Sequence, residues 1–440
     1  MAMGAYPGAH EGKCMDTSKI LFDYGTVQSS HVGIDVLNPI KMRITVVLDH
    51  EVDGEFLKQA WDRTKRVYPL IESVLRTSEG ADMGRFLDPA YSRAHLGDRL
   101  YLVQAEGGSN DPVMSKVPVT PGCDLVGNRL LSVTYCGRQI SLCAYHLLVD
   151  GQGMTSILRT LVYAYLALHT GHEDENPVVE LRENRRPEEY YQVKTNEILR
   201  SMEYAPVPIY TLPLGCRGYL DEDMRNEGND VLSGTLAMDA GEFLRLCKSN
   251  GANPSAMSCA LLARAAYALG PAETRDLVFG ITTSQRNELG INDSIANVVG
   301  YAFTYATRAE VEGLSLAEVS QRLRKDIGMQ RGRDYVGTIS RVNDTYGANV
   351  RSIRRTVTYM GTFSVGSNDV HIVDYWIDNN GRSNYYLVEA NGVFYMTLLY
   401  GTATQRYLAE LARSLEELGV HAELRHPAHV IPLGSSTAVL

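Results

Sequence analysis

Residues 145–151 read Tyr-His-Leu-Leu-Val-Asp-Gly, and this short stretch decides how the rest of the chain is interpreted. His146 ends an apolar run that begins at Gln139, which is typical of a buried strand. The Asp150-Gly151 pair then turns the chain into a segment with apolar residues at helical spacing. The pattern predicts a strand, a tight turn and a helix, with His146 at the strand end, where side chains tend to project into clefts.

These residue types suit proton transfer. An imidazole accepts a proton from an alcohol or amine at neutral pH. An acid four residues later can hold the local geometry through hydrogen bonds or an arginine partner, and Gly151 permits a close approach that a side chain would block. The spacing alone is weak, because residues 31–35 (His-Val-Gly-Ile-Asp) share it, but no glycine follows there. From these residues alone, a buried histidine with satisfied hydrogen bonds remains open beside a catalytic one.

Outward from this stretch, the first part of the chain alternates strands and helices. Residues 42–48 are rich in β-formers, and residues 56–68 have helical periodicity. Residues 129–136 and 139–146 read as a hairpin with Gly137 and Arg138 at the turn, followed by a helix over 154–166. Residues 171–187 are charged and contain prolines, which indicates a linker.

The second part repeats this alternation. Strands are expected at 276–284, 298–307, 356–363, 370–378 and 384–400, the last split into a hairpin by Asn391-Gly392. Helices are expected from Pro254 to Leu269, from Ser315 to about Met329, and from Thr404 onward. The tail over 427–440 looks irregular. We therefore expect an α/β protein with two lobes of mixed sheet flanked by helices, at 1–180 and 181–440.

Composition excludes several classes of protein. Hydrophobic residues make up 44% and charged residues 21% of 440 residues, which indicates a folded globular chain. The formal charge of −10 argues against nucleic-acid binding through phosphates. No secretory signal and no transmembrane segment is visible, so we expect a cytoplasmic protein. Seven cysteines without Cys-x-x-Cys spacing predict neither a disulfide framework nor a zinc site.

Two weaker patterns were weighed against ordinary explanations. Gly151-Gln-Gly153 at a helix start is compatible with a phosphate cradle but lacks a third glycine. His421, His426 and His429 are compatible with a metal site, although a solvated tail is the simpler explanation. The chain has no Gly-x-Ser-x-Gly elbow, Ser-x-x-Lys or Walker A sequence, so hydrolase and NTPase interpretations lack their nucleophile or cradle.

The stretch 145–151 resembles the His-His-x-x-x-Asp-Gly motif of the chloramphenicol acetyltransferase-like superfamily, with Tyr145 in place of the first histidine. That superfamily includes condensation domains, alcohol O-acyltransferases, wax ester synthases and polyketide-associated acyltransferases. Further segments resemble it in the same order; these are residues 52–75, 279–286, 297–300 and 358–361. Tyr-Pro-Leu-Ile at 68–71 departs from its usual His-Pro-Leu-Arg, and the Asp-Phe-Gly-Trp-Gly motif of plant members is absent.

The resemblance implies a tunnel between the lobes. A thioester donor, either coenzyme A or the phosphopantetheine of an acyl or peptidyl carrier protein, would enter one end, and an alcohol or amine acceptor the other. His146 would be the general base, and Asp150 would pair with Arg286. Thr358, Tyr145 and Gly300 would contact the oxyanion or substrate.

The resemblance implies no metal and no cofactor. We expect an acyltransferase. A stand-alone condensation enzyme and a non-catalytic, partner-binding member of the same fold remain alternatives.

Overall fold

The computed structural model describes thirteen segments of the chain; these are residues 20–26, 41–77, 99–104, 111–115, 130–146, 148–191, 195–213, 230–270, 276–341, 343–353, 355–379, 384–399 and 404–432. Within these segments, no helix combines the length and apolar character that are needed to cross a membrane.

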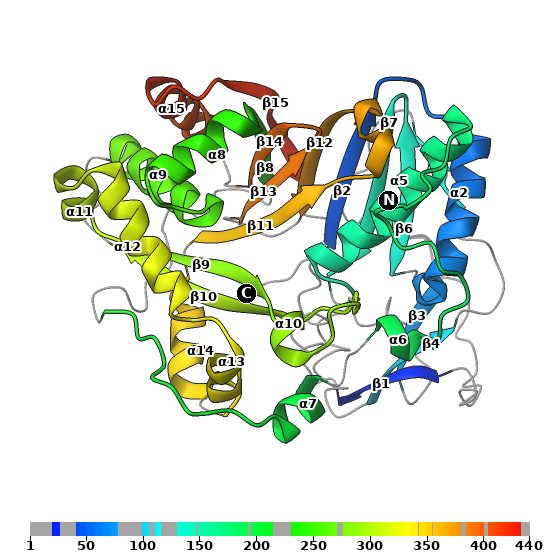
Figure 1. Cartoon of the computed structure of the whole chain (residues 1–440), viewed down its shortest axis with the longest axis horizontal. Helices are drawn as coiled ribbons and strands as arrows, with labels where there is room; N and C mark the ends of the chain where they lie inside the picture. Colours follow the sequence, from blue (N-terminus) through cyan, green and yellow to red (C-terminus); the bar gives the residue numbers. More distant parts are fainter. Residues whose placement is uncertain are drawn as a thin grey trace, which may run out of the picture.

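One mixed sheet has the strand order β12-β2-β7-β6-β5, with β5 and β6 parallel and the other pairs antiparallel (Figure 1). Its strands from the first half are β2 (Lys41–Leu48), β5 (Val113–Met114), β6 (Leu131–Cys136) and β7 (Gln139–Tyr145). The helices connected to these strands are α2 (Gly54–Val67), η2 (Pro69–Glu72) and α5 (Gly151–Thr170). The predicted hairpin and the helix that follows it are confirmed.

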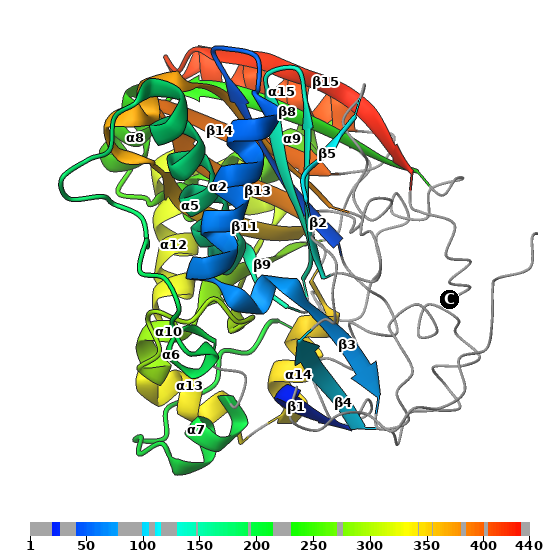
Figure 2. The ribbon, with the colours of Figure 1, turned by 90° about the vertical axis from the view of Figure 1, so that its right-hand side faces the viewer.

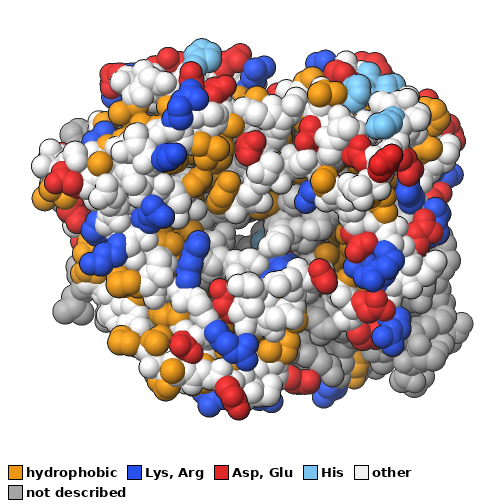
Figure 3. Space-filling model, viewed as in Figure 1, with side chains coloured by type: hydrophobic (Ala, Val, Ile, Leu, Met, Phe, Trp, Pro, Cys, Tyr) orange, Lys and Arg blue, Asp and Glu red, His pale blue; other side chains and the backbone are white. Residues whose placement is uncertain are grey.

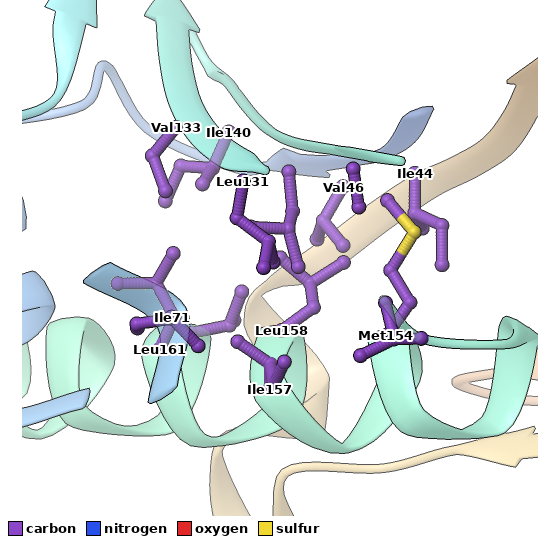
Figure 4. Packing of buried hydrophobic residues seen from close by; sticks show 14 of the residues in the cluster. Ile44, Val46, Ile71, Leu131, Val133, Ile140, Met154, Ile157, Leu158 and Leu161 are labelled. Atoms are coloured by element: carbon purple, nitrogen blue, oxygen red, sulfur yellow. The ribbon is translucent and has the colours of Figure 1, made fainter. Parts of the chain in front are cut away.

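Helix α5 lies against this sheet because its apolar side chains recur every three or four residues. Figure 4 shows Met154, Leu158 and Leu161 of α5 facing Ile44 of β2 and Ile140 of β7. All of these side chains are fully buried. The packing holds the start of α5, and therefore the turn after β7, in one position relative to the sheet.

The second sheet has the order β10-β9-β11-β13-β14-β8-β15, with β11 parallel to both β9 and β13. Its elements, with the helices between them, are β8 (Asp230–Asp239), α8 (Ala240–Ser249), α9 (Pro254–Leu269), β9 (Leu277–Ser284), α10 (Arg286–Leu289), β10 (Val299–Ala306), α11 (Arg308–Gly313), α12 (Leu316–Gly328), α13 (Arg333–Ile339), α14 (Asn343–Arg351), β11 (Arg355–Phe363), β13 (Asn384–Ala390), β14 (Val393–Leu399), α15 (Thr404–Glu417) and β15 (Ala422–Pro432).

Capping residues explain several boundaries in this half. Asn253 accepts a hydrogen bond from the backbone of Ala256, and Ser315 exchanges hydrogen bonds with Glu318, so both predicted helix starts are confirmed. Asn391 and Gly392 both have positive φ, at 46° and 75°, as a two-residue hairpin turn requires. Helices α8, α9, α12 and α15 contribute to one apolar core with this sheet.

Strand β12 (Ile372–Asn379) comes from the second half of the sequence but pairs with β2 in the first sheet. A buried ion pair joins these strands, since Arg43 of β2 donates two hydrogen bonds to Asp378 of β12. Asp378 also accepts a hydrogen bond from Ser233 of β8, at 3.0 Å. The two sheets are thus tied together by a strand that the sequence division at residue 180 assigns to the second lobe.

A smaller antiparallel sheet, β1 (Ile20–Thr26), β4 (Arg99–Gln104) and β3 (Ser73–Thr77), lies apart from the other two (Figure 2). The prediction that the chain is irregular from residue 427 is wrong for residues 427–432. Strand β15 continues to Pro432 and forms the edge of the sheet beside β8. An edge strand tolerates Pro427 and Pro432, because no further strand needs backbone N–H donors on its outer side. Residues 171–186 contain no helix or strand, and the short helices α6 (Pro187–Tyr190) and α7 (Thr195–Ser201) follow.

Candidate active site

His146 lies directly after β7, at the point where the chain leaves the first sheet. The backbone N–H of Leu148 donates to the carbonyl of Tyr145 at 3.0 Å and closes a tight turn. The side chain of His146 is half-buried. The imidazole therefore lies at the C-terminal end of β7, a central strand whose end is held in place by α5.

Asn297, from the second half, contacts His146 twice. Its amide nitrogen lies 2.9 Å from the carbonyl oxygen of His146 and 3.0 Å from Nδ1. A carbonyl oxygen can only accept, so the amide nitrogen donates there, and the same NH₂ group faces Nδ1. Asn297 therefore occupies the Nδ1 edge of the ring.

The structure brings Asp150 and Arg286 together. Two parallel hydrogen bonds of 2.8 Å join the guanidinium to the two carboxylate oxygens, in the bidentate geometry that strengthens such pairs. Asp150 is 0% exposed and Arg286 is 2% exposed. The carboxylate also accepts from the backbone of Gly153, which caps α5, and of Val298. One buried side chain thus joins the helix start to the segment beside Asn297.

Arg286 is also enclosed by its own half. The guanidinium donates to the carbonyl oxygens of Ser294 and Ala296, at 2.5 and 2.8 Å, and to the hydroxyl of Ser284 at 3.1 Å. A backbone bridge between Val149 and Ala296 runs alongside. Because every guanidinium nitrogen has a partner within the protein, Arg286 serves to position this junction.

Three glycines mark close approaches in this region. A Cβ at Gly153 would overlap the backbone carbonyl of Ile295, and one at Gly151 would lie 2.6 Å from the sulfur of Met360. At Gly300 the obstacle is the side chain of Gln285. The N–H of Gly153 already donates to the carboxylate of Asp150, so this residue does not offer its N–H to a phosphate, and the cradle stays an untested alternative.

Tyr145 and Thr358 differ in their surroundings. Tyr145 is 5% exposed and belongs to the apolar core between the first sheet and α5. Its ring lies under the ammonium group of Lys41. Burial, with a smaller contribution from Cys143, raises the pKa of Tyr145 to about 12, so the phenol stays protonated at neutral pH. Thr358 is half-buried on β11, two residues before the Met360 that touches Gly151. No hydrogen bond joins it to His146 among the described residues.

Figure 3 shows a hollow near the centre of the face, between the two halves. A pocket of about 150 Å³ lies beside the start of α5 and includes Gln152, Ser156, Arg159 and Arg185 in its lining. His146 is not among the residues that line this pocket. The tunnel implied by the resemblance remains a prediction.

Asn297 is the residue that sequence reasoning missed. It occurs in the 297–300 segment quoted for the resemblance, but nothing local connects it with His146, which lies 151 residues away. Cys143, Cys247 and Cys259 are buried free thiols. His421 is an exposed partner of Glu416 and does not support a metal site there, and the side chains of His426 and His429 lie outside the described residues.

No protein-family model matches the chain, and no curated protein matches it. Solved structures do match the chain. Polyketide synthase associated protein 5 from Mycobacterium tuberculosis superimposes with a TM-score of 0.61 at 13% identity, covering 89% of this chain and 97% of the other. F. sporotrichioides TRI101, solved with coenzyme A and T-2, gives 0.55 at 12% identity, covering 92% and 99%. The likeness spans almost the full length of both proteins, so the chain shares the fold of these two structures, and the expected two-lobed α/β architecture is confirmed.

Proposed function

We propose that this protein is an acyltransferase that moves an acyl group from a thioester to an alcohol or amine, with His146 as general base. The observation that carries the proposal is the junction at His146. The imidazole from the first half is held by Asn297 of the second, next to a buried Asp150–Arg286 pair that joins the same two segments. A structurally similar protein was solved with coenzyme A, which supports coenzyme A as the donor class.

In the proposed reaction, Nε2 accepts the proton of the acceptor hydroxyl or amine as the acceptor attacks the thioester carbonyl. The tetrahedral intermediate then collapses, the C–S bond breaks, and the proton passes from Nε2 to the leaving thiolate. The hydroxyl of Thr358 would stabilise the negatively charged oxygen of this intermediate by donating a hydrogen bond to it. Neither a metal nor another cofactor is needed to balance this chemistry.

The contact with Asn297 places a condition on the first step. An amide N–H that donates to Nδ1 leaves the proton of a neutral imidazole on Nε2. A base acting through Nε2 needs that nitrogen unprotonated, so two changes must precede proton transfer. The amide must release Nδ1, and the imidazole must change tautomer by giving its Nε2 proton to solvent while Nδ1 takes one up. The hydrogen bond to the carbonyl of His146 would keep Asn297 in place during these changes.

The test measures thiol release from a series of acyl-coenzyme A donors, and from acyl groups loaded on a carrier protein, with alcohol and amine acceptors. His146→Ala should lower the rate by about 10²–10⁴-fold while the fold is retained. The matched control is His421→Ala, which removes an exposed histidine far along the sequence and should leave the rate unchanged.

Near-normal turnover of His146→Ala would refute the base. If the unaltered protein binds coenzyme A or a carrier but releases no thiol with any acceptor, the protein is a binding member of the fold rather than an enzyme.

A further inference from the structure

A second cluster of titratable side chains lies at the opposite end of α5 from Asp150. Asp49 and His50 follow directly after β2, and His371 ends the short 3₁₀ helix η6 (Gly366–His371) that leads into β12. His169 belongs to the last turn of α5. Because α5 rises by 1.5 Å per residue, this end of the helix is about 27 Å from the Asp150 end. The cluster is therefore separate from the candidate active site.

The ligand atoms in the cluster converge. One carboxylate oxygen of Asp49 lies 2.6 Å from Nδ1 of His50, and the other lies 3.0 Å from Nδ1 of His371. One ligand atom from each of the three residues lies within 4.8 Å of the other two. In a tetrahedral centre with Zn–N bonds of about 2.0–2.1 Å, neighbouring ligand atoms are about 3.3 Å apart. Small side-chain rotations would therefore place all three around one ion.

The backbone positions two of the ligands. The N–H of Asp49 donates to the carbonyl of His371 at 3.0 Å, which continues the ladder of β2 and β12 beyond the Leu48–Ile372 pair. Asp49 and His371 are 322 residues apart in sequence, yet they are held side by side by the same sheet.

The third ligand, His50, is oriented by its surroundings. Its Nε2 lies 3.3 Å from the hydroxyl of Tyr165, which also accepts the backbone N–H of Asp53. The ring of His169 stacks on that of His50, with centroids 3.6 Å apart and an angle of 1°. Because a carboxylate can only accept, Nδ1 of His50 carries a proton in the arrangement with Asp49, and an ion would replace that proton. A proton on Nε2, donated to the Tyr165 hydroxyl, would then give His50 the outer partner that metal-ligating histidines commonly have.

From this geometry we propose a binding site for a divalent transition metal of the zinc class, with Asp49, His50 and His371 as ligands and water in the fourth position. Two imidazoles and one carboxylate favour Zn²⁺, Co²⁺ or Ni²⁺ over Mg²⁺ or Ca²⁺, which prefer oxygen ligands. The three side chains are 43%, 18% and 27% exposed, so an ion can enter from solvent. Figure 3 shows histidine side chains gathered at the upper right of the face.

The expected role is structural. Asp49 and His50 belong to the first half, and His371 is the residue directly before β12, the strand that the second half contributes to the first sheet. An ion shared by them ties β12 to β2. Because the ion binds only where the two strands are paired, it should stabilise the folded state by an amount that grows with the logarithm of the free ion concentration above the dissociation constant.

The experiment uses the full chain without a polyhistidine tag, stripped with a chelator, and titrated with ZnCl₂ by calorimetry. The unaltered protein should take up one more equivalent of Zn²⁺ than His371→Asn or His50→Asn. Tyr165→Phe keeps all three ligands but loses the outer partner, so its affinity should fall by about 10–100-fold. Zn²⁺ should raise the melting temperature of the unaltered protein and not that of His371→Asn, and MgCl₂ should do neither.

The matched control is His421→Asn, which removes an exposed histidine that also pairs with a carboxylate but lies outside the cluster. It should bind Zn²⁺ like the unaltered protein. If His371→Asn takes up Zn²⁺ with unchanged stoichiometry and affinity, or if the stripped protein binds none, the three side chains form only a hydrogen-bonded network and the proposal is overturned.

Discussion

The Asp150–Arg286 pair should contribute more to folding stability than to the rate of the reaction, and its coupling is measurable. The perturbations are Asp150→Ala, Arg286→Ala and the double variant. Both side chains are almost fully buried, so removing one leaves the other as an unpaired charge in the interior. That situation costs about 3–5 kcal/mol of unfolding free energy.

The structure also predicts an order for the two single variants. Asp150 accepts the backbone N–H of Gly153 at the start of α5, and losing such a cap costs about 1 kcal/mol in addition. Asp150→Ala should therefore be the more destabilising of the two. The double variant should lose clearly less than the sum of the singles, because it leaves no buried charge without a partner.

The assay is unfolding by urea, followed by tryptophan fluorescence and circular dichroism, with coincident transitions required before free energies are compared. The control cycle uses Arg63 and Glu173, which form an ion pair of 2.6 Å at 27% and 54% side-chain exposure. An exposed pair of this kind should couple by less than about 1 kcal/mol. Additive losses for Asp150 and Arg286, or coupling no larger than in the control pair, would refute the reasoning.

Three further predictions concern other positions. Gly153→Ala should strongly destabilise the fold because its Cβ would overlap a backbone carbonyl, whereas Gly313→Ala, with open space around the added carbon, should be neutral by thermal melting. Arg43→Met should cost about 3–5 kcal/mol by removing the arginine that balances the buried charge of Asp378, and adding Asp378→Leu should recover part of that loss in the same urea assay. Burial raises the pKa of Tyr145 from the ordinary 10 to about 12, so the stability that depends on the neutral phenol is full below pH 10 and falls as the pH rises toward 12. Tyr145→Phe should remove that part of the alkaline loss, and a steeper loss in the variant would contradict the assignment.

Local pattern was sufficient to predict the strand, turn and helix around His146. The alternation of apolar residues in β7, the Asp150 cap and the apolar face of α5 each depend on neighbours only a few residues away. The Asn391-Gly392 hairpin is predictable for the same reason, since two residues with positive φ determine the turn.

Other elements could not be predicted in this way. Strand β8 contains Ser233 and Gly234, which interrupt its apolar run, and it forms because β14 and β15 complete its hydrogen bonds on both sides. Strand β15 carries two prolines and is a strand only because it occupies the edge of the sheet.

Local residue type and spacing predict where strands end and where helices begin, because period and capping are short-range properties of the chain. Which of these ends meet depends on tertiary packing. It placed Asn297 on the imidazole of His146, paired β12 with β2, and brought His371 to Asp49. Such pairings depend on how the two sheets and their helices bury their apolar faces against each other. The residues that share this packing energy are far apart in sequence, so a local pattern does not predict which of them pair.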